Sequence, residues 1–169
     1  MKKNLILTGM MGVGKSTIGR ALAKKLKMNF IDIDKVIEKG ESMTIDEIFK
    51  KKGENYFRNL EENTTLRELN KKESVIALGG GAFINHKIRS EILKTCVSFW
   101  LDLDLNIIKK RVETSKKRPL LKNGKLNETL KRLYSKRKEI YNLANYKIDC
   151  NKDNQNLILE KIISNYVSK

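Results

Sequence analysis

The sequence predicts an α/β fold of three layers (α/β/α), in which helices cover both faces of a central five-stranded, mostly parallel sheet. Two observations lead to this prediction. Five short apolar runs are each bounded by turn or polar residues, as strands are, and helical patterns fill the intervals between them. Strands that alternate with helices pack as a parallel sheet with both faces covered. With 169 residues, the chain is long enough for one such core, so we expect a single domain over residues 1–169.

The predicted elements alternate along the chain. The strands are Leu5–Leu7, Phe30–Ile31, Val75–Leu78, Val97–Leu101 and Tyr146–Ile148. The first helix shares an apolar face between Ile18 and Leu26, and Thr44 with Glu47 has the spacing of a capping box at another helix start. Further helical patterns cover residues 54–71, 86–94, 104–114, 127–143 and 155–167.

Composition excludes several classes of protein. The longest apolar runs are far below the roughly 18 residues of a membrane span, and residues 1–7 offer no apolar region of a secretion signal, so we expect a cytoplasmic protein with no membrane partner. Cys96 and Cys150 lie in or beside apolar segments without a close Cys or His partner, which indicates reduced packing residues. The single histidine, His86, is expected to have a surface or helix-capping role.

The chain is strongly basic, with a formal net charge of +16. Its basic residues are scattered through nearly every predicted helix instead of forming one tract, so we do not expect nucleic-acid binding. Only 8 of the 36 basic residues are Arg. Because Arg alone offers a flat, bidentate fork for carboxylate or phosphate, the few Arg positions are candidates for function.

The most specific motif is a phosphate-binding loop. Gly9, Gly14, Lys15 and Ser16 fit the pattern Gly-x-x-x-x-Gly-Lys-Ser, directly after a strand and at the start of a helix. In such loops backbone N–H groups and the helix N-terminus face the phosphates, the Lys bridges the β- and γ-phosphates, and the Ser hydroxyl binds Mg²⁺. The alternative is a simple glycine turn before a helix.

Two carboxylates follow the second strand. In Phe30-Ile31-Asp32-Ile33-Asp34, the period of two in a strand places Asp32 and Asp34 on the same side, at the end of the strand where ligands of open α/β sheets bind. One can orient or deprotonate an attacking hydroxyl while the other holds a metal-bound water. The alternative is that Asp caps the following helix.

Weaker motifs follow along the chain. The stretch from Gly53 to Glu61 opens a helix and places Arg58 and Glu61 three residues apart, for which an exposed ion pair is the ordinary explanation. Three glycines end a buried strand, where a ligand could touch backbone amides. They are Gly79, Gly80 and Gly81.

The last motifs lie in the second half of the chain. Residues 114–125 are rich in charge and turn formers and contain the only proline, so this segment is either a surface loop or a lid that excludes water. It contains Arg118, with Arg111 one helical stretch earlier. Arg137 lies four residues before Tyr141.

Together, the order and spacing of these motifs resemble the shikimate kinase family over nearly the whole chain. The resemblance implies a P-loop kinase architecture with strand order 2-3-1-4-5, a substrate-binding segment at about 34–62 and a lid at about 114–125. It implies transfer of the γ-phosphoryl group of ATP to the 3-hydroxyl of shikimate, giving shikimate 3-phosphate in the route to chorismate and aromatic amino acids.

The resemblance also implies residue roles. Lys15, Asp34 and Arg118 would be catalytic, and Ser16 and Asp32 would hold Mg²⁺. The ATP contacts would be Gly12, Val13, Gly14, Lys15, Ser16, Thr17, Arg111 and Arg118. The shikimate contacts would be Asp34, Arg58, Gly79, Gly80, Gly81 and Arg137.

Two positions depart from the family pattern. Glu139 stands where a proline is frequent, and Asn151-Lys152-Asp153 offers no arginine beside the adenine, so the adenine contacts there are left unassigned. We expect a monomer. The alternative functions are a kinase for another small hydroxylated acid, such as gluconate, and a nucleotide-dependent RNA-binding module.

Overall fold

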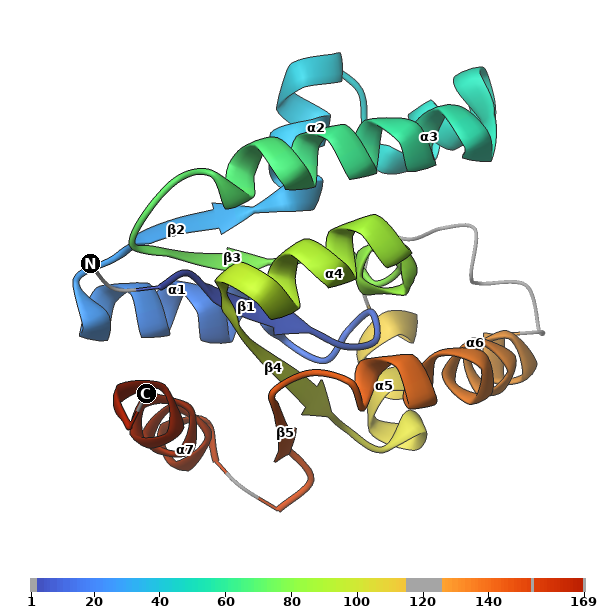
Figure 1. Cartoon of the computed structure of the whole chain (residues 1–169). Helices are drawn as coiled ribbons and strands as arrows, with labels where there is room; N and C mark the ends of the chain where they lie inside the picture. Colours follow the sequence, from blue (N-terminus) through green and yellow to red (C-terminus); the bar gives the residue numbers. More distant parts are fainter. Residues whose placement is uncertain (1–2, 115–125, 153, 169) are drawn as a thin grey trace.

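The computed structural model describes residues 3–114, 126–152 and 154–168, in which strands and helices alternate (Figure 1). The expected lid, apart from Thr114, and Arg118 within it lie outside the described residues. The elements in chain order are β1 (Leu5–Thr8), α1 (Lys15–Leu26), β2 (Asn29–Asp32), α2 (Ile33–Glu41), α3 (Ile45–Leu69), β3 (Ser74–Ala77), η1 (Ala82–Ile84), α4 (His86–Thr95), β4 (Val97–Asp102), α5 (Leu105–Glu113), α6 (Leu126–Tyr141), β5 (Tyr146–Asp149) and α7 (Gln155–Val167).

The five strands form one parallel sheet in the order β2-β3-β1-β4-β5, which confirms the predicted fold class and strand order. In the register, Leu5 of the central strand β1 lies between Val75 of β3 and Val97 of β4. Moving away from β1, the sheet therefore continues with β3 and β2 on one side and with β4 and β5 on the other. Ligands of open α/β sheets bind at the carboxyl ends of the strands at such a switch point, so the loop after Thr8 is placed for binding.

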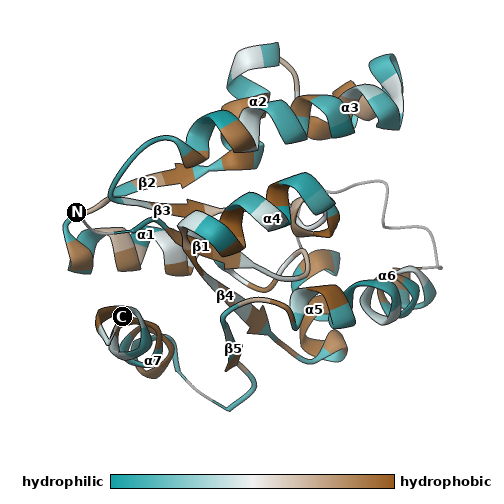
Figure 2. Cartoon of the chain, in the orientation of Figure 1, coloured by the Kyte–Doolittle hydropathy of each residue, from teal (hydrophilic) through white to brown (hydrophobic). Residues whose placement is uncertain are grey.

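Helices cover both faces of the sheet. α1 packs on β2 and β3 and against α7, whereas α4 packs on β4 and against α3. Figure 1 shows α1 and α7 on one side of the sheet and α4 on the other. In Figure 2 the strands are largely brown, and the helices combine brown with teal turns. This pattern is typical of amphipathic helices around a buried parallel sheet.

Helix α3 begins earlier than the predicted helix over residues 54–71. Thr44 Oγ1 accepts from Glu47 N at 3.2 Å and Glu47 Oε2 accepts from Thr44 N at 2.8 Å, so the predicted capping box is present and starts the helix at Ile45. Gly53, with φ 83° and ψ 169°, then divides α3 into two segments. Only glycine adopts this backbone conformation readily. The motif from Gly53 to Glu61 thus opens the second segment, as predicted.

Helix α6 is tied to the neighbouring strands. Tyr134 Oη donates to Asp102 Oδ1 at 3.1 Å, and Asp102 Oδ2 pairs with Lys147 Nζ at 3.0 Å. Burial, together with the Asp102 charge, raises the pKa of Tyr134 to about 12, so this hydroxyl stays a donor at neutral pH. The helix continues through Glu139 to Tyr141, so the residue that replaces the frequent proline neither starts nor ends it.

The remaining small predictions concern single residues. Cys96 and Cys150 are free, buried thiols, which confirms the packing interpretation. His86 is exposed at the start of α4, but the cap is Asn85, whose Oδ1 accepts from Lys87 N at 2.9 Å. Within residues 3–114, 126–152 and 154–168, no helix has the length and apolar character to cross a membrane.

Candidate active site

The loop between β1 and α1 has the character of an anion site. Gly14, the N-cap of α1, has φ 104° and ψ 19°, in the left-handed region that residues with a side chain rarely adopt. Lys15 is the first residue of α1, and its Nζ turns back to donate to the carbonyl oxygens of Gly9 at 2.7 Å and Met10 at 2.9 Å. A helix N-terminus and an ammonium group both favour phosphate, so the loop carries the charge that a nucleotide requires.

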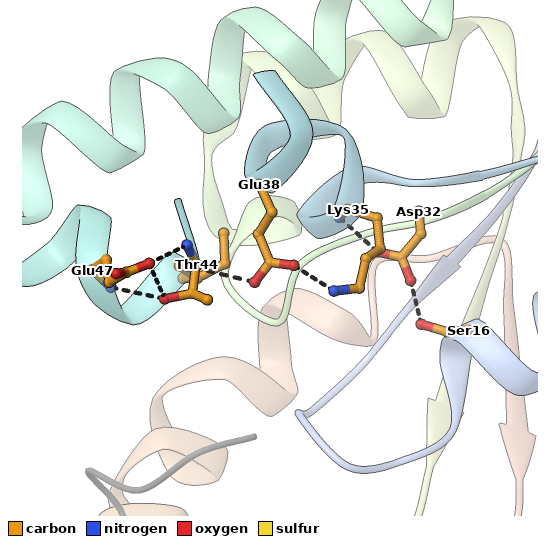
Figure 3. A network of polar contacts seen from close by, with 7 residues as sticks. Ser16, Asp32, Lys35, Glu38, Thr44 and Glu47 are labelled. Carbon is orange, nitrogen blue, oxygen red and sulfur yellow. Dashed lines mark hydrogen bonds and ion pairs between the residues drawn. The ribbon is translucent and has the colours of Figure 1, made fainter. Parts of the chain in front are cut away.

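Ser16 and Asp32 bring two hard oxygen donors together beside this loop. Ser16 Oγ donates to Asp32 Oδ2 at 2.5 Å, and Asp32 Oδ1 accepts from Lys35 N at 3.3 Å, which caps α2 (Figure 3). Asp32 is therefore a cap and a site carboxylate at once. Figure 3 also shows the network continuing to the start of α3, where Glu38 Oε1 accepts from Ile45 N at 3.2 Å.

Asp34 does not continue strand β2. The strand ends at Asp32, and Asp34 lies in the first turn of α2. The prediction that both carboxylates lie on the same side of one strand is therefore wrong. The reason is that Asp32 caps the helix, which turns the backbone one residue later. Asp34 still faces the turn formed by Gly79, Gly80 and Gly81 after β3, called the glycine turn below, because its Oδ1 lies 2.7 Å from the position that a Cβ on Gly79 would occupy.

The glycine turn after β3 lies against side chains from α2 and α3. A Cβ on Gly79 would also lie 2.7 Å from Glu61 Oε1, and a Cβ on Gly81 would lie 2.6 Å from Arg58 Nη1. Real Cβ atoms essentially never make contacts under 3.0 Å. The glycines at positions 79 and 81 thus allow the close approach of two carboxylates and a guanidinium group to the backbone.

Arg58 is held from several directions. Its Nη1 pairs with Glu61 Oε2 at 2.7 Å and its Nε with Glu54 Oε1 at 3.4 Å. The guanidinium carbon lies 5.1 Å from the centroid of the Phe57 ring and 5.9 Å from that of Phe49, within the range of cation–π attraction. The Arg58 side chain remains 37% exposed, so a fixed cation is presented at an accessible surface.

The burial of Glu61 contradicts the interpretation of Arg58 and Glu61 as an exposed ion pair. Its side chain is only 3% exposed, so the pair with Arg58 is not an exposed ion pair. Burial raises the pKa of Glu61, and the nearby Asp34 charge acts in the same direction, whereas Arg58 and Arg137 oppose the rise. Two carboxylates and two guanidinium groups therefore influence one another in this part of the site.

Helix α6 contacts the glycine turn through two side chains. The carbonyl oxygen of Gly80 accepts from Arg137 Nη1 at 3.1 Å and from Tyr141 Oη at 2.5 Å. A Cβ on Gly80 would lie 3.5 Å from Met11 N, so the same residue also adjoins the phosphate-binding loop. The glycine turn is the place where the two parts of the site meet.

A cavity of about 440 Å³ opens beside the loop and is lined in part by Gly12, Val13 and Gly14. Arg111 lines it, and Arg111 Nη1 donates to the carbonyl oxygens of Gly12 at 3.3 Å and Val13 at 3.2 Å. The lining residues are Gly12, Val13, Gly14, Thr17, Ile18, Arg111, Cys150, Gln155 and Ile158. Such a cavity, with apolar and polar walls and one cation beside a phosphate loop, has the chemistry of a nucleotide base site.

The structure brings the predicted site residues of the described ranges into two groups, which meet where Gly80 adjoins Met11 of the phosphate-binding loop. The loop group consists of Gly12, Val13, Gly14, Lys15, Ser16, Thr17, Asp32 and Arg111, and the acceptor group of Asp34, Arg58, Gly79, Gly80, Gly81 and Arg137. Sequence reasoning assigned no site role to the residues that support them. Phe57 belongs to the motif from Gly53 to Glu61, whereas no local motif marks the others, whose contacts come from packing, namely Phe49, Cys150, Gln155 and Ile158.

Transfer of a phosphoryl group to a small molecule requires that a nucleotide loop and an acceptor site lie within reach of each other. Here Gly80 lies between them, since its carbonyl oxygen accepts from Arg137 and the residue adjoins Met11 of the loop. By fold and by site, the chain is a P-loop kinase of the small-molecule class. More particularly, it belongs to the shikimate kinase family: residues 11–167 match the family model described as shikimate kinase.

Individual relatives agree with this assignment. The chain is 43% identical to the shikimate kinase of Bartonella quintana, over 98% of this chain and 80% of that relative. It is 42% identical to the shikimate kinase of a Sulfurihydrogenibium species, over 96% of both chains. The structure of the Acinetobacter baumannii shikimate kinase in complex with shikimate superimposes with a TM-score of 0.93 at 32% identity, covering 99% of this chain and 94% of that one.

A gluconokinase from Sinorhizobium meliloti shares the fold at a TM-score of 0.62 and 16% identity, covering 98% of this chain and 92% of that one. At that identity the likeness extends to the fold alone.

Proposed function

We propose that this protein transfers the γ-phosphoryl group of ATP to the 3-hydroxyl of shikimate, giving shikimate 3-phosphate and ADP in the route to chorismate and aromatic amino acids. The observation that carries the proposal is the glycine turn. It lies against Asp34 and Arg58 on one side and adjoins the phosphate loop at Met11 on the other. An acceptor on this turn would present its hydroxyl beside the γ-phosphate.

On the nucleotide side, Lys15 and the amides of the loop would hold the β- and γ-phosphates. The Lys15 ammonium already lies over the loop, on the carbonyl oxygens of Gly9 and Met10, so a short movement of one side chain brings it onto a phosphate. Phosphoryl transfer needs little covalent help from the protein, and positioning with charge neutralisation dominates. Arg118, the proposed lid arginine that would add charge neutralisation, lies outside the described residues.

Ser16 and Asp32 fit a magnesium ion. Mg²⁺ takes one or two protein oxygens and completes its octahedron with phosphate oxygens and waters, and here a hydroxyl and a carboxylate oxygen lie 2.5 Å apart beside the loop. When bound, the ion would neutralise charge on the β- and γ-phosphates.

The base of ATP would occupy the cavity lined by Arg111. The sequence left the adenine contacts near Asn151-Lys152-Asp153 unassigned, and Cys150, Gln155 and Ile158 line the cavity in that part of the chain. Arg111 is fixed by the carbonyl oxygens of Gly12 and Val13. Its flat guanidinium group is suited to stack on the base.

On the acceptor side, Arg58 and Arg137 would bind the carboxylate of shikimate. They come from different helices, α3 and α6, and both lie near the glycine turn. A guanidinium group binds a carboxylate through two parallel hydrogen bonds, which fixes the orientation of the acceptor ring. Asp34, beside Gly79, would then align the 3-hydroxyl or accept its proton.

The experiment that tests the proposal is a coupled ADP-release assay. Shikimate, gluconate and nucleoside monophosphates are supplied in parallel with Mg²⁺ and ATP, and we expect fast release with shikimate only. Fast release with gluconate instead would establish the alternative kinase. Salt-sensitive RNA binding without any shikimate-dependent release would support the RNA-binding alternative. We further propose that the protein acts as a monomer in the cytoplasm, and sedimentation of the purified enzyme tests the first of these.

A further inference from the structure

The three carbonyl groups of the glycine turn are held in different ways. Gly79 O accepts from Ala82 N at 3.1 Å and Gly81 O accepts from Ile84 N at 3.1 Å, which are backbone bonds of η1. Gly80 O is held by side chains of α6, Arg137 at 3.1 Å and Tyr141 at 2.5 Å. The position of the middle peptide of the turn therefore depends on two side chains 57 and 61 residues away along the chain.

These two donors have different freedom. Arg137 is partly exposed, whereas Tyr141 is fully buried, with its ring 6.0 Å from that of Trp100 and its hydroxyl 3.9 Å from Met10 Sδ. Under the proposed function Arg137 must also bind the acceptor carboxylate. Because Tyr141 is buried, its hydroxyl can hold Gly80 continuously while Arg137 also offers donors to the substrate.

We propose that Tyr141 is a positioning residue for the acceptor. Its hydroxyl keeps the Gly80 carbonyl in place, so that the guanidinium group of Arg137 can bind the substrate carboxylate as well as Gly80. An arginine has five N–H donors, so Arg137 can keep Nη1 on Gly80 and offer others to the carboxylate, provided that Gly80 stays where Tyr141 holds it. This inference rests on the proposed acceptor site.

The chain contains a matched control for this role. Tyr166 on α7 is also buried, its hydroxyl donates to the carbonyl oxygen of Lys3, and it lies 3.8 Å from Met28 Sδ. Tyr166 thus makes the same two kinds of contact as Tyr141. Its partners lie just before β1 and just after α1, and the strand ends that bind ligands are at the opposite edge of the sheet. Tyr166→Phe measures the general cost of removing such a hydroxyl.

The experiment compares Tyr141→Phe and Tyr166→Phe with the wild-type protein in shikimate titration calorimetry and in steady-state kinetics. For Tyr141→Phe we expect the shikimate dissociation constant and KM to rise by about three- to thirtyfold, which is what a lost hydrogen bond to a buried carbonyl corresponds to. The KM for ATP should change by less than about twofold, because the loop keeps its own contacts. Tyr166→Phe should leave both KM values unchanged.

Several outcomes overturn the inference. It is wrong if Tyr141→Phe shifts shikimate affinity no more than Tyr166→Phe does, or if it shifts the KM for ATP equally. It is also wrong if Tyr141→Phe is unfolded under conditions where Tyr166→Phe is folded, because the hydroxyl is then structural. If the wild-type protein does not use shikimate, the proposed function fails separately, and the same comparison is made with the acceptor that does release ADP.

Discussion

Substitution of Gly81 by alanine adds one methyl group beside Arg58 and so tests whether Arg58 belongs to the acceptor site. The added Cβ would lie 2.6 Å from Arg58 Nη1, so the guanidinium group must move by about 0.8 Å to reach the ordinary contact distance of 3.4 Å. Gly81 has φ −105° and ψ −12°, which alanine adopts without strain. The perturbation is therefore directed at the position of Arg58 and spares the backbone.

The expected effect follows from the bond that is disturbed. Arg58 Nη1 pairs with Glu61 at 2.7 Å, and under the proposed function the same group binds the substrate carboxylate. A hydrogen bond to a charged group contributes about 1.5 to 3 kcal/mol, so loss of one raises the KM for shikimate by about 10- to 150-fold. The melting temperature should stay within about 4 °C of the wild-type value, because the displaced group is the end of a flexible side chain.

The assay is ADP release at varied shikimate and at varied ATP, with the melting temperature measured on the same samples. Gly40→Ala on α2 is the control, because a Cβ there meets no atom within 4 Å; it should leave both KM values unchanged. An unchanged KM for shikimate in Gly81→Ala, or a rise confined to ATP, would refute the placement of Arg58 at the acceptor.

Three further predictions address other parts of the site. Asp34→Asn should lower kcat by about 100-fold or more, since the loss of a general base or aligning carboxylate typically costs 10²–10⁴; turnover at the wild-type rate would remove Asp34 from the mechanism. Arg111→Ala should raise the KM for ATP while sparing that for shikimate, and the reverse pattern in the same kinetics would contradict the assignment of the cavity. Glu61 has a raised pKa, so the folded protein holds the proton longer than the unfolded chain. Wild type should therefore lose stability relative to Glu61→Gln as the pH rises from about 4 through the raised pKa. Urea unfolding of both proteins between pH 4 and pH 7 measures this difference. The same dependence of the unfolding free energy on pH in both proteins would contradict the prediction.

The sequence predicted the elements of the fold because its signals are local. Each strand is a short apolar run with turn residues at its ends, and the start of α3 is marked by Thr44 and Glu47, which form the capping box that their spacing indicates. The start of α2 was harder to predict. Asp32 can end a strand or cap a helix, and only the bond from Lys35 N shows that the helix begins there and carries Asp34 with it.

The parts of the site that a local sequence motif indicates were predictable. The parts that depend on the packing of distant segments were not. Lys15 and Ser16 follow from the loop pattern alone. The burial of Glu61 depends on how α3 lies against the glycine turn, and the bond from Tyr141 to Gly80 joins residues 61 positions apart. Periodicity and spacing describe neighbours along the chain, so they contain no information on such long-range contacts.

The placement of the arginines shows why a chain so rich in lysine keeps Arg at these positions. Arg58 lies on two aromatic rings while its Nη1 meets Glu61, and Arg111 reaches two successive carbonyl oxygens with one nitrogen. Arg137 reaches Gly80 from α6 with Nη1. A lysine has a single ammonium nitrogen. It therefore cannot bond to the protein with one nitrogen and present other nitrogens to a ligand in a fixed plane. The function that we propose needs both at once, because each of these cations must be fixed by the protein before the carboxylate or the nucleotide arrives.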